Sequence, residues 1–150
     1  MAAEATVART TQVYQVFIRA SADEIWQAIT RPEWTARYFH GAHITVTPDR
    51  YDSRSADGDV WGDAGVEVFD PPRRLVHGWR SLYDPALAAE EESRVTWEIE
   101  EQEGDVCLLT VVHDRLENAP GTAASVSGTG WMGVLSALKT LLETGRPLYR

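Results

Sequence analysis

The chain has 150 residues, which is enough for one domain with a sizeable core and argues against two. Hydrophobic residues make up 43% of the sequence and charged residues 25%, a balance that excludes a disordered chain, and no apolar run is long enough for membrane insertion. With 23 acidic against 14 basic residues the net charge is −9, so binding of nucleic acid through its phosphates is not expected.

The first predicted strand covers residues 11–18, where β-branched and aromatic residues alternate, and we expect both of its faces to be partly covered. A helix should follow at Ser21, because Ser21 and Glu24 have the spacing of a capping box. Pro32 ends this helix and suits the first turn of a second short helix, which should run to about Phe39.

Residues 41–113 predict antiparallel strands, because Gly and Pro separate short runs that alternate or are rich in β-branched residues. Asp57-Gly58 and Glu103-Gly104-Asp105 are typical hairpin turns. The acidic residues 83–92 have no strand pattern and predict a loop, with room for one helical turn. The predicted strands are residues 42–47, 51–56, 60–69, 75–82, 94–101 and 106–113.

A long amphipathic helix is predicted over residues 131–144, where apolar side chains repeat every three to four residues. Thr129 suits its N-cap, and Gly145 and Pro147 suit its end. The small residues before it predict no regular element.

The order of these elements is one strand, two short helices, six strands and a long helix, which predicts an α+β fold. A curved antiparallel sheet of about six to seven strands would surround the C-terminal helix and leave an apolar gap beneath it. We expect residues 1–10 to form a flexible tail without a signal sequence, and residues 11–148 to form a single domain.

Three segments resemble one known family. They are YQVFIRASADEIWQAITRPEWTARYF near the start, GVEVFDPPRRLVHGWR in the middle and GWMGVLSALKTLLETGRPL near the end. They resemble the bacterial family related to the C-terminal domain of the activator of heat shock protein 90 ATPase, an AHSA-like branch of the START-like (SRPBCC, Bet v-like) superfamily. The resemblance implies the helix-grip fold. It leaves function open, because this superfamily includes lipid carriers, cyclases, hormone receptors and co-chaperones.

The tryptophans call for an explanation, because the chain has 6 of them. Alternation places the tryptophans of the predicted strands on faces that would turn toward the terminal helix. The first residue of that predicted helix is also a tryptophan. Such faces would line a pocket for a hydrophobic or aromatic ligand, with two histidines and a serine to orient it. The candidate ligand-binding residues are Trp61, His77, Trp79, Ser81, Trp97, Leu109, Val111, His113, Trp131 and Leu135.

These residues also have a purely structural interpretation, in which the tryptophans fill the core and their indole N–H groups bind backbone carbonyls. Trp131 would then be the first core turn of its helix and not a lid. A cavity of at least about 300 Å³ lined by Trp79, Trp97 and Trp131 would favour ligand binding, whereas a filled core would favour a protein-interaction function.

No catalytic residue, metal site or cofactor is assigned from the sequence. The four histidines lack metal-ligand spacing. His113-Asp114 could position a general base, as in a cyclase-like enzyme, but Asp114 ends a strand and resembles a solvated charge. Cys107 has no neighbouring activator, and as the only cysteine it excludes an internal disulfide and is typical of a cytoplasmic protein.

The leading hypothesis is therefore a bacterial, cytoplasmic protein that binds a lipid, polyketide or flavonoid-like molecule without catalysis. A protein partner stays open as the alternative, since the resemblance implies co-chaperone activity and the acidic residues 90–105 contrast with Arg73-Arg74. Val106, Leu108 and Val112 on the presumed outer face leave both a monomer and a homodimer open.

Overall fold

A single antiparallel sheet of seven strands organises the chain, in the order β1-β7-β6-β5-β4-β3-β2. The computed structural model describes residues 10–127 and 129–149, so most of the predicted tail lies outside the described residues. The strands are β1 (Gln12–Ile18), β2 (His43–Val46), β3 (Arg50–Arg54), β4 (Val60–Asp70), β5 (Arg74–Trp79), β6 (Ser93–Glu101) and β7 (Cys107–Asp114). The helices are α2 (Ala22–Thr30), α3 (Pro32–Thr35), α4 (Pro85–Ala88), α5 (Pro120–Val126) and α6 (Thr129–Thr144).

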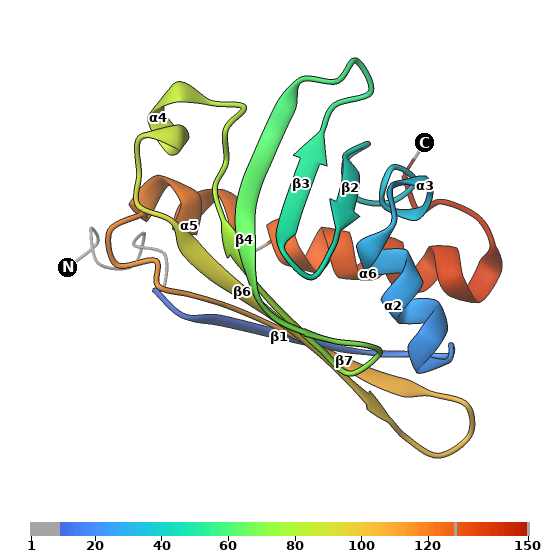
Figure 1. Cartoon of the computed structure of the whole chain (residues 1–150). Helices are drawn as coiled ribbons and strands as arrows, with labels where there is room; N and C mark the ends of the chain where they lie inside the picture. Colours follow the sequence, from blue (N-terminus) through green and yellow to red (C-terminus); the bar gives the residue numbers. More distant parts are fainter. Residues whose placement is uncertain (1–9, 128, 150) are drawn as a thin grey trace.

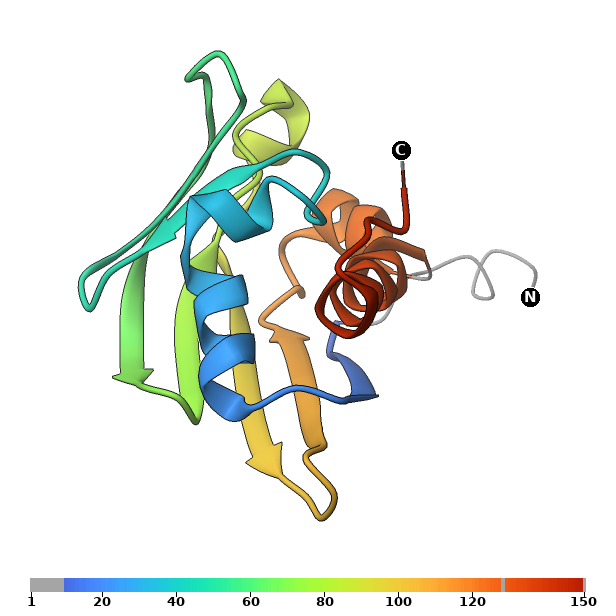
Figure 2. The same cartoon turned by 90° about the vertical axis from the view of Figure 1, so that its right-hand side faces the viewer.

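The sheet curves around α6, as the predicted helix-grip architecture requires (Figure 1). Seen from the side, α2 and α3 lie on the same face of the sheet as α6, and α2 contacts both α6 and β6 (Figure 2). The main core is enclosed between these layers. No helix among the described residues is long and apolar enough to cross a membrane.

Local signals explain the first helices. The capping box is confirmed, because the Glu24 amide donates to Ser21 Oγ at 3.1 Å and the Ser21 amide donates to a Glu24 carboxylate oxygen at 3.0 Å. α3 is shorter than predicted and ends at Thr35, whose hydroxyl donates to the Ala42 carbonyl and accepts from the Ile44 amide. These bonds fasten the end of α3 to β2.

Three other expectations need correction. The outer face of β1 is more open than expected, with Val13 57% and Phe17 56% exposed, because β1 is an edge strand and no helix among the described residues covers that face. The strand predicted over residues 75–82 ends at Trp79, beyond which the Leu82 amide donates to the Trp61 carbonyl. Thr129 is the first residue of α6 and not its N-cap.

The stretch of small residues before α6 forms α5, which the sequence did not predict. The N-cap residue of α5, Ala119, has no capping side chain. Instead the Glu90 carboxylate, from the acidic loop after α4, accepts from the Gly121 and Thr122 amides at 2.7 and 2.8 Å and from the Thr122 hydroxyl at 2.7 Å. A distant side chain therefore supplies the cap that the local sequence lacks.

Candidate functional site

A cavity of about 390 Å³ lies between the sheet and the start of α6. Its walls come from the turn after α3, from β3 and β4, from the end of β5 and the chain that follows it, and from α5 and α6. The lining residues are Phe39, His40, Ala42, Tyr51, Ser53, Trp61, Gly62, Trp79, Arg80, Ser81, Tyr83, Ser125, Val126, Gly130, Trp131 and Val134. Its volume is within the range of small-molecule sites, which begins at about 300 Å³.

Small residues on β4 leave room for the cavity. In the register of β3 with β4, Tyr51 faces Ala64 and Ser53 faces Gly62, so two inward side chains of β3 have almost no side chain opposite them. The pairing shifts between Ser53 and Arg54, and Trp61 is the β4 residue left unpaired at this bulge; its side chain lines the cavity.

Aromatic rings surround the open space. Phe39, Trp79 and Trp131 contact one another, with ring centroids 5.6 Å apart for the two tryptophans and 6.0 to 6.3 Å apart for Phe39 and each of them. Trp61 packs edge-on against Tyr83 at 6.5 Å. Such walls offer apolar surface and the faces and edges of rings to a flat aromatic ligand.

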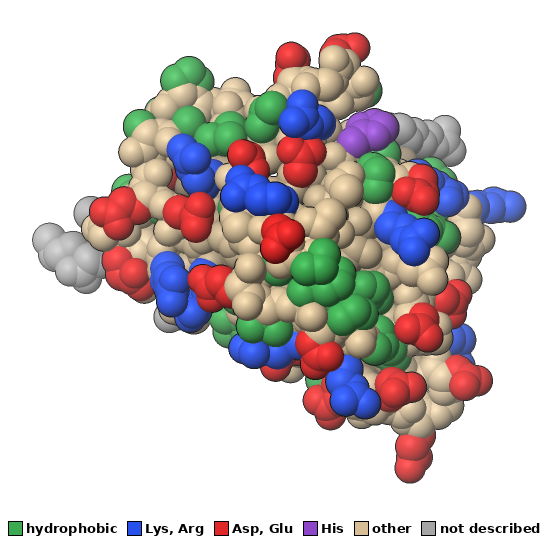
Figure 3. Space-filling view, viewed as in Figure 1, with side chains coloured by type: hydrophobic (Ala, Val, Ile, Leu, Met, Phe, Trp, Pro, Cys, Tyr) green, Lys and Arg blue, Asp and Glu red, His purple; other side chains and the backbone are tan. Residues whose placement is uncertain are grey.

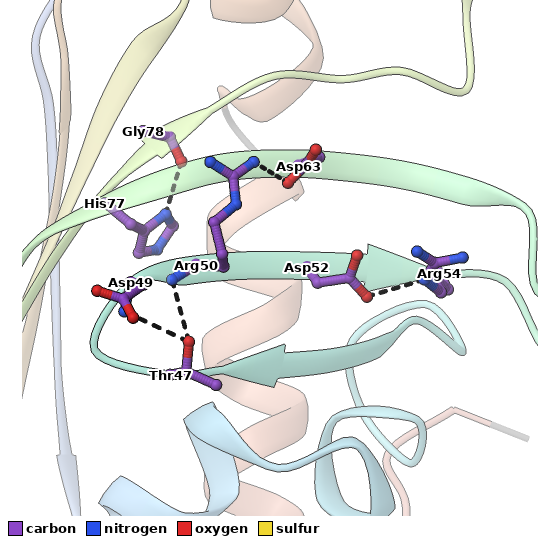
Figure 4. A network of polar contacts seen from close by, with 8 residues as sticks. All are labelled: Thr47, Asp49, Arg50, Asp52, Arg54, Asp63, His77 and Gly78. Atoms are coloured by element: carbon purple, nitrogen blue, oxygen red, sulfur yellow. Dashed lines mark hydrogen bonds and ion pairs between the residues drawn. The ribbon is translucent and has the colours of Figure 1, made fainter.

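His77 lies beside the cavity in the core, and both of its ring nitrogens are occupied. The Trp97 indole N–H donates to Nε2 at 3.0 Å, and because indole is only a donor, Nδ1 must carry the proton and donate to the Gly78 carbonyl at 2.7 Å (Figure 4). The Tyr51 ring stacks on the imidazole at 3.8 Å. Burial lowers the pKa of His77 to about 4, although the bond to Gly78 opposes this shift.

His113 is held in the same way with the opposite tautomer. The Trp131 indole N–H donates to Nδ1 at 3.1 Å, so Nε2 carries the proton and donates to Ser93 Oγ at 2.8 Å. The Ser93 hydroxyl in turn donates to the Trp79 carbonyl. Burial, and then the proximity of His77, lower the pKa of His113 to about 3, against the opposing charge of Asp114.

The predicted candidates therefore divide into two groups. Trp61, Trp79, Ser81 and Trp131 line the cavity. The others are buried in the core outside its walls, and two of them, the histidines, have no ring nitrogen left for a ligand. These core residues are His77, Trp97, Leu109, Val111, His113 and Leu135.

Sequence reasoning missed several lining residues. Tyr51 and Ser53 could have been found, because alternation places them on one face of a predicted strand and the first is aromatic. Phe39 follows the last turn of α3, and Val126 belongs to the unpredicted α5, so no pattern in the sequence placed either residue at the site.

The arrangement needed for general-base catalysis at His113 is not formed. Asp114 lies in β7 next to His113 but on the other face, where Arg94 binds it with two hydrogen bonds of 2.9 and 2.6 Å. These bonds outweigh the effect of burial and lower the pKa of Asp114. Cys107 is buried, and burial followed by the charge of Glu101 raises its pKa, which disfavours the thiolate.

The described residues contain no group of three or more His, Cys, Asp or Glu side chains arranged to hold a metal ion. On the face shown in Figure 3, acidic and basic side chains are interspersed. Cross-strand pairs such as Arg74 with Glu98 and Arg94 with Asp114 partly neutralise the charge contrast that the sequence indicated.

A curved antiparallel sheet that holds a C-terminal helix defines a START-like protein of the helix-grip class. Within this class the chain belongs to the family described as activator of Hsp90 ATPase homolog 1-like protein, which matches residues 19–143. No curated protein matches the chain.

Solved structures support the same fold. DynU16, a protein in the dynemicin biosynthetic locus, is 27% identical with a TM-score of 0.73 over 93% of this chain and 49% of its own, so the chain spans about half the length of DynU16. CalU16 from Micromonospora echinospora is 20% identical, with a TM-score of 0.65 over 93% of this chain and 84% of its own. The Aha1 dimer from Colwellia psychrerythraea is 16% identical, with a TM-score of 0.69 over 91% of this chain and 98% of its own.

Proposed function

We propose that this protein binds a hydrophobic aromatic small molecule, without covalent chemistry, in the cavity between the sheet and α6. The observation that carries the proposal is the cavity itself, about 390 Å³ in volume and walled by Phe39, Trp61, Trp79 and Trp131. A core whose only task was stability would be filled, because empty space forfeits dispersion contacts.

Two further observations support this function. The similarity to DynU16, a protein in the dynemicin biosynthetic locus, supports a small molecule of a biosynthetic pathway as the ligand. The single cysteine, Cys107, is buried and unpaired, which suits a reducing compartment, and we place the protein in the bacterial cytoplasm. In this proposal residues 11–148 act as one binding domain.

Titration followed by NMR of the indole N–H signals tests the proposal. We expect emodin, a fused-ring aromatic compound, to shift the signals of Trp79 and Trp131 at sub-millimolar concentration, and palmitate and naringenin to shift them less. Trp26 serves as an internal control, because it is buried against Phe69 and does not line the cavity. Trp79→Ala should weaken binding at least about tenfold through lost ring contacts, whereas Trp34→Phe, outside the cavity, should not. If none of the three compounds perturbs Trp79 or Trp131, the proposal is wrong.

The alternative function is protein interaction, which the family description favours. It predicts that the protein stimulates the ATPase of Hsp90 in an assay that contains no small ligand. Stimulation in that assay, together with an empty cavity in the titration, would replace the first proposal by the second.

A further inference from the structure

β3 presents two different faces. On its outer face Arg50 pairs with Asp63 of β4, and Arg54 donates to an Asp52 carboxylate oxygen at 3.0 Å (Figure 4). The outward side chains of β3 thus have polar partners within the protein.

On the inner face, Tyr51 and Ser53 are 4% and 8% exposed and both line the cavity. Neither hydroxyl has a hydrogen-bond partner among the described residues. Among the described residues, however, every side-chain oxygen or nitrogen that is sealed from solvent has a hydrogen-bond partner. Both hydroxyls must therefore contact accessible space, and the space that these two residues line is the cavity.

Such hydroxyls are unusual in an aromatic-walled site, because a buried polar group without a partner costs free energy. The neighbouring polar groups are more engaged: both histidines are bonded on both nitrogens, and Ser81 Oγ accepts the Trp79 indole N–H at 3.2 Å, which leaves Ser81 only its own proton to donate. Burial raises the pKa of Tyr51, so its hydroxyl keeps its proton at neutral pH and can donate to an acceptor.

Among the described residues, the cavity offers no buried charge to balance an ionised ligand. No Asp or Glu is among the lining residues, and the basic residues among them, His40 and Arg80, are exposed. Arg80 lies just beyond the end of β5, and the residue is exposed to solvent. A carboxylate placed against β3 would lose its hydration without gaining a cation.

We infer that Tyr51 and Ser53 form the polar recognition point of the cavity, and that they select an uncharged aromatic ligand with a carbonyl or hydroxyl oxygen directed at β3. This inference rests on the proposed function. The ligand's aromatic body would lie against the rings of Trp79, Trp131 and Phe39. Its oxygen would accept hydrogen bonds from the two hydroxyls.

Three naphthalene derivatives of nearly the same shape test this inference by isothermal titration calorimetry with the full chain at pH 7.5. They are 2-acetylnaphthalene, which carries a neutral carbonyl, 2-ethylnaphthalene, which carries none, and 2-naphthoate, which is an anion. We expect 2-acetylnaphthalene to bind about three- to tenfold more tightly than 2-ethylnaphthalene, the gain of about one net hydrogen bond, and 2-naphthoate to bind most weakly.

The variants Tyr51→Phe and Ser53→Ala remove one hydroxyl each and keep the surrounding shape. Together they should lower the affinity for 2-acetylnaphthalene to that of 2-ethylnaphthalene and leave 2-ethylnaphthalene unchanged, which also shows that the cavity is still folded. Tyr38→Phe is the matched control, because the Tyr38 hydroxyl donates to the Ala28 carbonyl outside the cavity.

The possible failures can be distinguished. If none of the three compounds binds the unmodified protein, the proposed function fails. If the acetyl and ethyl compounds bind equally and the variants change neither, the protein is a binder but Tyr51 and Ser53 do not recognise the ligand. Tightest binding of 2-naphthoate would overturn the selection for uncharged ligands.

Discussion

At the scale of single residues, the two buried histidines hold the tryptophans in place. Each imidazole accepts an indole N–H on one nitrogen and donates its proton from the other, so each must be neutral to complete its bonds. Alternation in the sequence predicted that His77 and His113 face inward, and both are buried. It could not predict that they bind the Trp97 and Trp131 indoles, because those contacts depend on how β5, β6, β7 and α6 pack together.

This arrangement predicts a loss of stability in mild acid. The folded-state pKa values, about 4 for His77 and about 3 for His113, are below the unfolded value of about 6.5, so the unfolded chain binds the extra protons. The contribution of the two histidines to the free energy of unfolding is complete above pH 6.5. Below pH 6.5 the free energy of unfolding should fall by up to about 1.4 kcal/mol per pH unit for each histidine. Urea unfolding from pH 7.5 to 5 measures this slope before most carboxylates titrate. His43→Gln, at an exposed site, should leave the slope unchanged, and a flat profile would show that the two buried histidines are not held in the neutral form.

Removal of one indole N–H should also be costly. Trp97→Phe leaves His77 Nε2 without its donor in a site that water does not reach, and we expect about 1–3 kcal/mol of lost stability from this alone. Trp34→Phe is the comparison, since Trp34 is half-buried and its ring contacts the Arg37 guanidinium at 5.4 Å. Chemical denaturation gives the free energy of unfolding of both variants. Equal decreases in the two variants would show that the indole–imidazole bond contributes little to stability.

At the scale of elements, the acidic loop after α4 matters more than its sequence suggests. Burial opposes ionisation of Glu90, but the Thr122 side chain and the Gly121 and Thr122 amides outweigh it and lower its pKa. The contact is close, because a Cβ at Gly121 would lie 2.9 Å from the Glu90 carboxylate. Because α5 forms one wall of the cavity, the hydrogen bonds between Glu90 and the start of α5 also support that wall.

Glu90→Gln should therefore loosen α5 specifically. The amide retains one acceptor but loses the charge that favours a helix N-terminus, and we expect a loss of about 1 kcal/mol. Hydrogen exchange at the Gly121 and Thr122 amides should become faster, with little change in the β6 and β7 amides. Glu91→Gln is the control, because Glu91 accepts from the exposed Asn118 side chain and not from the helix. Equal effects of both variants would remove Glu90 from this role.

At the scale of the whole molecule, the tryptophans both fill and line the space between sheet and helix. The sequence predicted this space and the inward faces of β5, β6 and β7, because alternation along a half-buried strand is a local signal. It could not predict which part stays open. That depends on the cross-strand register that sets Gly62 opposite Ser53 and Ala64 opposite Tyr51, and on α5, whose cap comes from a distant loop.

If the open part is the ligand site, filling it from the helix should abolish binding without unfolding the protein. A ligand present at about 100 times its dissociation constant stabilises the folded state by about 2.7 kcal/mol, which should raise the Tm by about 5–10 °C for a chain of this length. Val134 is buried in α6 and lines the cavity, so Val134→Phe should occupy the space and remove most of the Tm rise caused by 2-acetylnaphthalene. Ser136→Phe adds the same ring to an exposed position of the same helix and should keep the full rise. A Val134→Phe protein that gives a native NMR spectrum and still shows the whole Tm rise would place the ligand outside this cavity.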